Sequence, residues 1–177
     1  MIRLVSFLRG INVGGRVVKK DKLKEVFASS GFQNVSTYKQ SGNVIFETTS
    51  TNIEEIKNDI EDALTRMLNY NVSVFIRTLP QLKQIIDTDP FQNQSKEGTS
   101  FLVTLLPSSV PKFPLQLPLT IPKSTALIIS AEGMEVFSVT HGGGEGALPN
   151  SFIESKLKLK ATTRNMNIIK EIVEKFG

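Results

Sequence analysis

The sequence predicts an α+β fold in which a regular N-terminal half packs on a second, less regular α+β half. Strand-like and helix-like segments alternate over residues 1–78, and five prolines fall within residues 107–123. The order over residues 1–78 is β-α-β-β-α-β, which is typical of the ferredoxin-like arrangement. We therefore expect a ferredoxin-like lobe at residues 1–78 and a second α+β lobe at residues 79–177, both sharing one core.

The first lobe begins with an apolar strand at residues 2–8, followed by a glycine-rich loop. Residues 19–31 then show helical spacing, with Leu23, Val26 and Phe27 inward and Gly31 just past the helix end. The glycine at that place favours the left-handed turn that ends many helices.

A hairpin and the clearest helix of the chain complete this lobe. Ser41-Gly42 separates two strand-like runs, which is a hairpin signal. Residues 51–70 form the helix: Thr51 or Asn52 caps it, and an apolar stripe runs along one side from Ile53 to Met67. A fourth strand follows at residues 71–79.

The second half alternates less regularly. A short helix capped by Thr78 is expected first, and the prolines of residues 107–123 favour an extended connection. The other predicted elements are a strand at 100–106, a hairpin of 125–130 with 134–140, and helices at 149–157 and 162–177.

Both faces of the first-lobe strands are apolar, since Leu4 and Leu8 alternate with Val5 and Phe7. A sheet with one solvent-exposed face would show a clearer alternation of apolar and polar residues along its strands. The two predicted helices cover one face, so the other is either packed by the second half or exposed as a ligand platform. Packing is favoured, because large exposed apolar patches are rare in stable monomers.

Composition excludes several chemistries. The chain of 177 residues has no cysteine and one histidine, His141, so thiol catalysis, disulfides and multi-histidine metal sites are excluded. We expect neither a metal nor a cofactor. No segment reads as a secretory signal or as a membrane span of about 20 apolar residues, so the prediction is a cytoplasmic protein without membrane contact.

Charge is unevenly distributed. Residues 1–40 hold eight Lys or Arg and two acids, residues 41–140 have a net charge of −4, and residues 141–177 have +2. If the two basic ends meet in space, they form a surface that attracts phosphate groups. The alternative is an ordinary mixed and solvated surface.

Three motifs carry a resemblance to a known family. The stretches LRGINVGG, TYKQSGNVIF and PNSFIESKLKLKATTRNMN occur in this order. Together they resemble the bacterial family known as domain of unknown function 1697. Met166 and Ile168 stand where that family usually has Trp and Thr. The resemblance implies an α+β fold with a ferredoxin-like half and assigns no activity.

The glycine-rich loop is a candidate anion site. Arg16 and Val17 after Gly15 exclude a Walker A loop, and the glycine spacing excludes a dinucleotide fingerprint. Glycines still permit an anion-binding nest of backbone amides, which arginines would reinforce. The alternative is a simple turn. The candidate residues are Arg9, Gly10, Asn12, Gly14, Gly15 and Arg16.

Two further segments are candidates for the same site. Ser41 and Asn43 lie at the hairpin tip, where turn chemistry is the simpler explanation. Thr163, Arg164 and Asn165 are expected at the start of a helix, where free amides and the dipole attract anions. The hypothesis is that all three segments form one positively polarised pocket.

These features favour a binding protein for a phosphate-bearing or otherwise anionic ligand, nucleic acid included. RNA recognition by the sheet itself is disfavoured, because the central strands lack the aromatic pattern that stacks bases. A small enzyme acting on an anionic metabolite and a structural or partner-binding protein stay open. No nucleophile–base pair is visible, so no reaction class is assigned.

Overall fold

The computed structural model describes residues 1–12, 14–39, 42–142 and 148–177. The chain divides into two compact units, one of residues 1–81 with 176–177 and one of residues 82–175. Each contains an antiparallel sheet, so the α+β class is confirmed. Within the described residues, no helix is long and apolar enough to cross a membrane.

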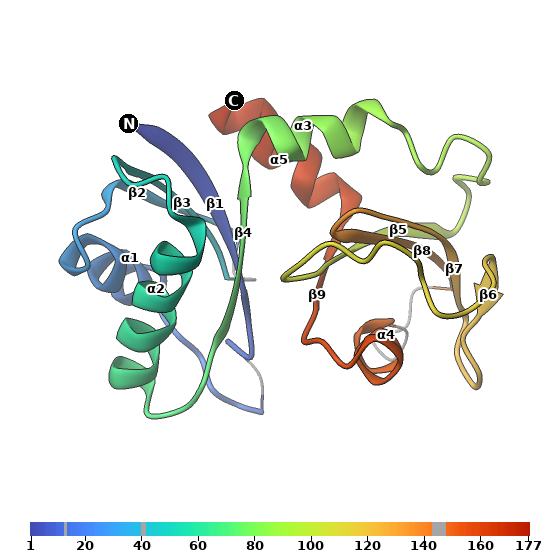
Figure 1. The fold of residues 1–177 in the computed structure, drawn as a ribbon, viewed down its shortest axis with the longest axis horizontal. Coiled ribbons are helices and arrows are strands. Elements are labelled where there is room, and N and C mark those ends of the chain that lie inside the picture. Colours follow the sequence, from blue (N-terminus) through green and yellow to red (C-terminus); the bar gives the residue numbers. More distant parts are fainter. Residues whose placement is uncertain (13, 40–41, 143–147) are drawn as a thin grey trace. The chain divides into compact units, whose positions relative to one another are not determined.

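The first unit follows the predicted order of elements. Its sheet has the strand order β2-β3-β1-β4, with β1 (Ile2–Arg9) between β3 (Asn43–Thr48) and β4 (Ser73–Thr78). β2 (Gln33–Tyr38) pairs with β3 as the predicted hairpin. The helices α1 (Lys20–Ser29) and α2 (Ile53–Leu68) lie on one face of this sheet (Figure 1).

The two helices begin and end for identifiable reasons. The Oδ1 atom of Asn52 accepts a hydrogen bond from the Glu55 amide at 3.3 Å, so Asn52 is the cap of α2. α1 ends at Ser29 and is followed by Gly31 at φ = +89°, as predicted. Leu23, Val26 and Phe27 of α1 are buried, and these positions are also as predicted.

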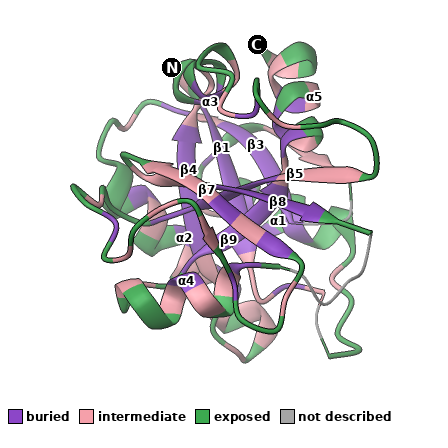
Figure 2. Cartoon of the chain, turned by 90° about the vertical axis from the view of Figure 1, so that its right-hand side faces the viewer, coloured by how far each residue is buried: buried purple, intermediate pink, exposed green. Residues whose placement is uncertain are grey.

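The core of the first unit lies between the helices and the sheet. The rings of Phe27, Phe32 and Phe46 contact one another, with centroids 4.7–6.0 Å apart. Geometries of this kind add to the stabilisation from apolar burial. The alternate strand positions Val5 and Phe7 are also fully buried. Figure 2 shows β1, β3 and β4 buried over most of their length.

A polar cluster joins three strands at one end of this sheet. Arg3 and Glu47 are directly opposite in the β1–β3 register, and two guanidinium nitrogens donate to Glu47 Oε1 at 2.9 and 2.7 Å. Asn34 donates to Glu47 Oε2 at 2.6 Å. The hydrogen bonds from Asn34 and Arg3 lower the pKa of Glu47 below its ordinary value of 4.5.

We predict that Glu47→Gln makes the first unit less stable at neutral pH, and that the difference from wild type shrinks on acidification. A carboxyl with a lowered folded-state pKa stabilises the fold above its unfolded pKa, and this contribution is lost as the pH falls through the folded pKa. Urea unfolding of wild type and variant at neutral pH and well below pH 4.5 measures this difference in stability. An equal difference at both pH values contradicts the prediction.

The second unit contains a five-stranded sheet with the order β6-β7-β8-β5-β9. Its strands are β5 (Thr99–Leu105), β6 (Leu119–Thr120), β7 (Ala126–Glu132), β8 (Glu135–His141) and β9 (Thr162–Asn165). Its helices are α3 (Leu79–Asp87), which begins before the unit boundary, α4 (Asn150–Leu157) and α5 (Met166–Phe176).

Two local predictions about this half are confirmed. Thr78 caps α3: its Oγ1 atom accepts from the Gln81 amide at 3.2 Å, and Gln81 Oε1 accepts from the Thr78 amide at 2.8 Å. Residues 107–123 contain only the two-residue strand β6 among regular elements. Phe113 and Ile121 of this segment are buried in an apolar cluster that includes Ile153 of α4.

The helix predicted at residues 162–177 is wrong in its first turn. Residues 162–165 form β9, which pairs antiparallel with β5, and α5 begins only at Met166. Thr162 and Thr163 have β-branched side chains, which fit a pleated sheet better than a helix turn. The Thr163 hydroxyl lies 2.8 Å from the Thr104 hydroxyl on β5, so a buried cross-strand pair fixes the strand.

Candidate functional site

The glycine-rich loop is closed by one side chain. Asn12 has φ = +55°, and its Oδ1 atom accepts a hydrogen bond from the Val18 amide at 2.7 Å. Asparagine tolerates the left-handed region because its short amide bonds the local backbone. The loop therefore folds back on itself before α1 begins.

The hairpin end lies against β1. The Gly42 carbonyl accepts from the Leu8 amide at 2.8 Å. Asn43 is buried, and its Nδ2 atom donates to the Tyr38 carbonyl at 3.1 Å. Lys39 has φ = +54°, a left-handed conformation that is uncommon for lysine. Asn12 is thus held by a backbone group of its own loop, and Asn43 by a backbone group across the hairpin.

A cavity of about 380 Å³ lies between the loop, the start of α1 and the hairpin end. Its apolar lining consists of Val17, Val18 and Leu23, with Gly42 at the hairpin. No described residue that lines it is acidic. Its polar lining consists of Asn12, Lys19, Lys20, Thr37, Lys39 and Asn43. We call this the basic cavity.

The electrostatics of the basic cavity favour an anion. Lys19 is the N-cap residue of α1 and makes no side-chain capping hydrogen bond, and Lys20 is the first helical residue. The dipole of a helix is positive at this end, so lysines here raise an already positive potential. Asp21 is the acidic residue of the first turn and does not line the cavity.

The structure places the predicted loop and hairpin residues differently. Asn12 and Asn43 both line the basic cavity. The Arg16 guanidinium instead lies 4.4 Å from the Tyr70 ring centroid, a cation–π contact. Arg9, Gly10, Gly14 and Gly15 do not line the cavity, and Ser41 lies outside the described residues.

Thr163, Arg164 and Asn165 belong to the second unit and lie in β9, where the first two are buried. Arg164 was expected to reinforce a helix N-terminus. It is instead 8% exposed and donates to Thr162 Oγ1 at 2.8 Å and to the Thr163 carbonyl at 2.9 Å. Burial lowers the pKa of Arg164 to about 10, so it stays charged at neutral pH.

Asn165 is the last residue of β9 and directly precedes α5, so it does lie at a helix start, as predicted. Its Oδ1 atom accepts a hydrogen bond from the Asn167 amide at 2.9 Å. Met166, the next residue, is 3% exposed and is the first residue of α5. The apolar side chain of Met166 therefore occupies a buried position at the start of α5.

The sequence-based candidates for an anion site did not include four polar residues that line the basic cavity, namely Lys19, Lys20, Lys39 and Thr37. A usable signal was present, because two consecutive lysines directly precede the apolar spacing of α1. Helix starts favour acidic residues, so lysines there are electrostatically costly. The unfavourable placement of two lysines at a helix start is therefore the signal that could have identified them.

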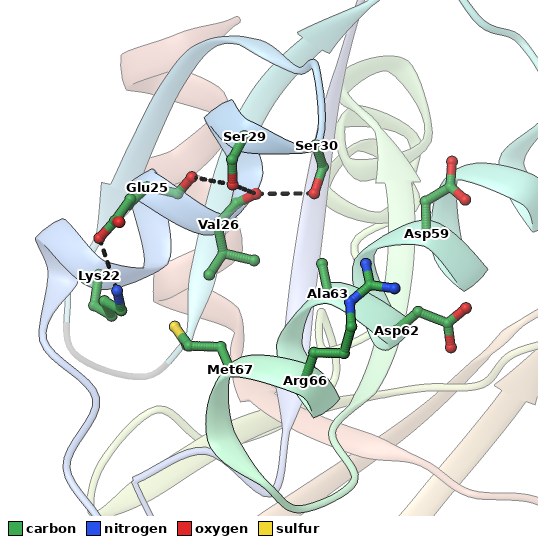
Figure 3. A pocket seen from close by; sticks show the side chains of 10 residues that line it. All are labelled: Lys22, Glu25, Val26, Ser29, Ser30, Asp59, Asp62, Ala63, Arg66 and Met67. Atoms are coloured by element: carbon green, nitrogen blue, oxygen red, sulfur yellow. Dashed lines mark hydrogen bonds and ion pairs between the residues drawn. The ribbon is translucent and has the colours of Figure 1, made fainter.

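A second cavity, of about 520 Å³, lies between α1 and α2 in the first unit (Figure 3). On α1, Lys22 Nζ pairs with Glu25 Oε2 at 3.0 Å. On α2, Asp59, Asp62 and Arg66 line the opposite wall. Charges of both signs therefore face this groove, which gives it no clear preference for a ligand charge.

The hydroxyl groups in this groove already donate within their own helix. Ser29 Oγ donates to the Glu25 carbonyl at 2.8 Å, and Ser30 Oγ donates to the Val26 carbonyl at 2.9 Å (Figure 3). The basic cavity is thus the better candidate, because its charged lining is of one sign.

The structure defines an α+β protein of two units, the first of which carries a basic cavity. The chain belongs to the family described as Protein of unknown function (DUF1697), whose model matches residues 1–137. The predicted family membership is therefore confirmed. The family description assigns no activity.

A solved structure shares the fold. The conserved bacterial protein SP0830 from Streptococcus pneumoniae aligns with a TM-score of 0.67 and 18% sequence identity, covering 99% of this chain and 98% of that chain. At this identity the likeness concerns the fold alone. No curated protein matches the sequence.

Proposed function

We propose that this chain is a binding protein for a small phosphate-bearing or otherwise anionic ligand, held in the basic cavity of the first unit. The observation that carries the proposal is the grouping of Lys19, Lys20 and Lys39 around one cavity, with no acidic residue among its described lining residues. Exposed lysines are usually interspersed with acids. A one-sign lining instead attracts counter-ions.

The start of α1 supplies the second element of recognition. Helix N-termini carry backbone N–H groups that point along the axis, and together with the dipole they favour phosphate and carboxylate groups. Lys19 has no side-chain hydrogen bond that caps this end. An anion in the cavity would therefore meet both the lysine ammonium groups and the positive end of the helix.

A small ligand is favoured over nucleic acid. None of the described lining residues is aromatic, whereas single-stranded nucleic acids are held by stacking on aromatic rings. A volume of about 380 Å³ falls in the range of clefts that hold small molecules. Nucleic acid binding is an outcome that the following test also detects.

The test is a titration of the full-length protein with inorganic phosphate and with phenyl phosphate at low salt, followed by NMR. We expect amide shifts at Asn12, Lys20 and Asn43. The double variant Lys19→Gln with Lys20→Gln is expected to weaken binding by about tenfold, since charge-assisted hydrogen bonds are lost. Added salt is expected to weaken wild-type binding as well.

The matched control is Lys24→Gln, because Lys24 is an exposed lysine of the same helix that does not line the basic cavity. It removes one positive charge without changing the cavity. Because the double variant removes two charges and the control one, a loss of binding free energy in the control of half that in the double variant, or more, contradicts a specific site. Binding of neither phosphate overturns the proposal, as does binding of RNA oligonucleotides alone.

A further inference from the structure

One wall of the basic cavity is aliphatic and open to solvent. Val17 is 81% exposed, the largest exposed fraction of any large hydrophobic side chain among the described residues. Val18, beside it, is half-buried and packs against the core of the first unit. Both residues line the cavity directly before Lys19 and Lys20.

An exposed valine by itself needs no explanation, because apolar atoms make up much of any protein surface. The position of Val17 beside the lysines is what matters for ligand binding. The same cavity contains the lysines and the helix start, so its apolar and its cationic surfaces face one space. Ligand sites commonly combine an apolar lining with a few polar groups that fix orientation.

The size of the cavity also exceeds what a bare anion needs. Clefts of roughly 300–1,000 Å³ hold small organic molecules, and the basic cavity has about 380 Å³. Inorganic phosphate would contact the lysines and leave the valine wall in water. An ester of phosphate would cover both surfaces.

We infer that the basic cavity takes an organic phosphate monoester, whose apolar group lies against Val17 and Val18 while its phosphate lies at Lys19, Lys20 and the start of α1. This inference rests on the proposed function and names the ligand class of that site. The binding is non-covalent, and no group is transferred.

The experiment compares phenyl phosphate with inorganic phosphate on the full-length wild-type protein and on two variants. In wild type, phenyl phosphate is expected to bind about fivefold to tenfold more tightly, because covering an aliphatic side chain contributes to affinity. Val17→Ser is expected to remove most of this advantage by weakening the binding of the ester, so that the two affinities become nearly equal. Val17→Ile, which keeps the apolar wall, is expected to retain the advantage.

The outcomes separate the two proposals. If both phosphates bind wild type with equal affinity, or if Val17→Ser leaves the advantage of the ester unchanged, the inference is overturned and the proposed function stands. If neither phosphate binds, the proposed function fails and the inference fails with it. Loss of inorganic phosphate binding in Val17→Ser overturns the inference too, because the valine would then act on the anion itself.

Discussion

Replacing Gly42 with alanine is expected to destabilise the first unit by about 3 kcal/mol. A Cβ atom at this position would lie 2.7 Å from Ile11 Cγ2 and 3.0 Å from Leu8 Cβ. Both neighbours are buried, and Leu8 belongs to β1, so neither has free space to move into. Gly42 also has φ = +70°, where a side chain adds backbone strain.

The matched control is Gly15→Ala. Gly15 has φ = +77°, close to that of Gly42, but no atom lies within 4 Å of an added Cβ. This variant isolates the cost of the backbone conformation, about 1 kcal/mol. Urea unfolding curves of the two variants give the steric contribution of Gly42 by difference. Equal losses of stability would mean that the hairpin end does not pack tightly on Leu8 and Ile11.

Local sequence patterns were sufficient to predict α2. The stripe through Ile56, Ile60 and Leu64 is buried, and Asn52 provides the cap. Every one of these signals involves residues within a few positions of one another, so the pattern and the structure agree.

Residues 162–165 show why the rest of the fold could not be predicted this way. Threonine and asparagine before an apolar helical pattern indicate a cap. The decisive interaction is with Thr104, 59 residues away in the sequence. Pairing between distant strands overrides a local cap signal, and a single sequence does not reveal the partner.

The candidate site was also predicted only in part from the sequence. Asn12 was a candidate as part of the glycine-rich loop and Asn43 as part of the hairpin tip, and both line the basic cavity. Arg16 was predicted as an anion ligand, but its guanidinium lies over the ring of Tyr70, which follows α2 in the chain. Lys39 enters the cavity lining from the hairpin, which the charge count alone did not associate with α1.

Arg164→Ala is expected to destabilise the second unit by about 3 kcal/mol. The guanidinium group is buried and donates to Thr162 Oγ1 and to the Thr163 carbonyl. Alanine removes these hydrogen bonds and leaves the space of a long side chain beside β9. Urea unfolding measures the loss, and Lys170→Ala, an exposed change on α5, is expected to stay within about 0.5 kcal/mol of wild type.

The same variant tests whether Arg164 acts on a ligand. The Nη1 atom of Arg164 donates to Thr162 and Thr163 of its own strand. We therefore expect Arg164→Ala to bind inorganic phosphate as wild type does under conditions in which the variant is folded. A tenfold loss of phosphate affinity without unfolding would support the single-pocket hypothesis, in which Thr163, Arg164 and Asn165 share the anion with Asn12 and Asn43. Unchanged phosphate affinity together with lost stability would mean that Arg164 stabilises the second unit and does not bind phosphate. The lysines of the first unit would then be the phosphate-binding residues.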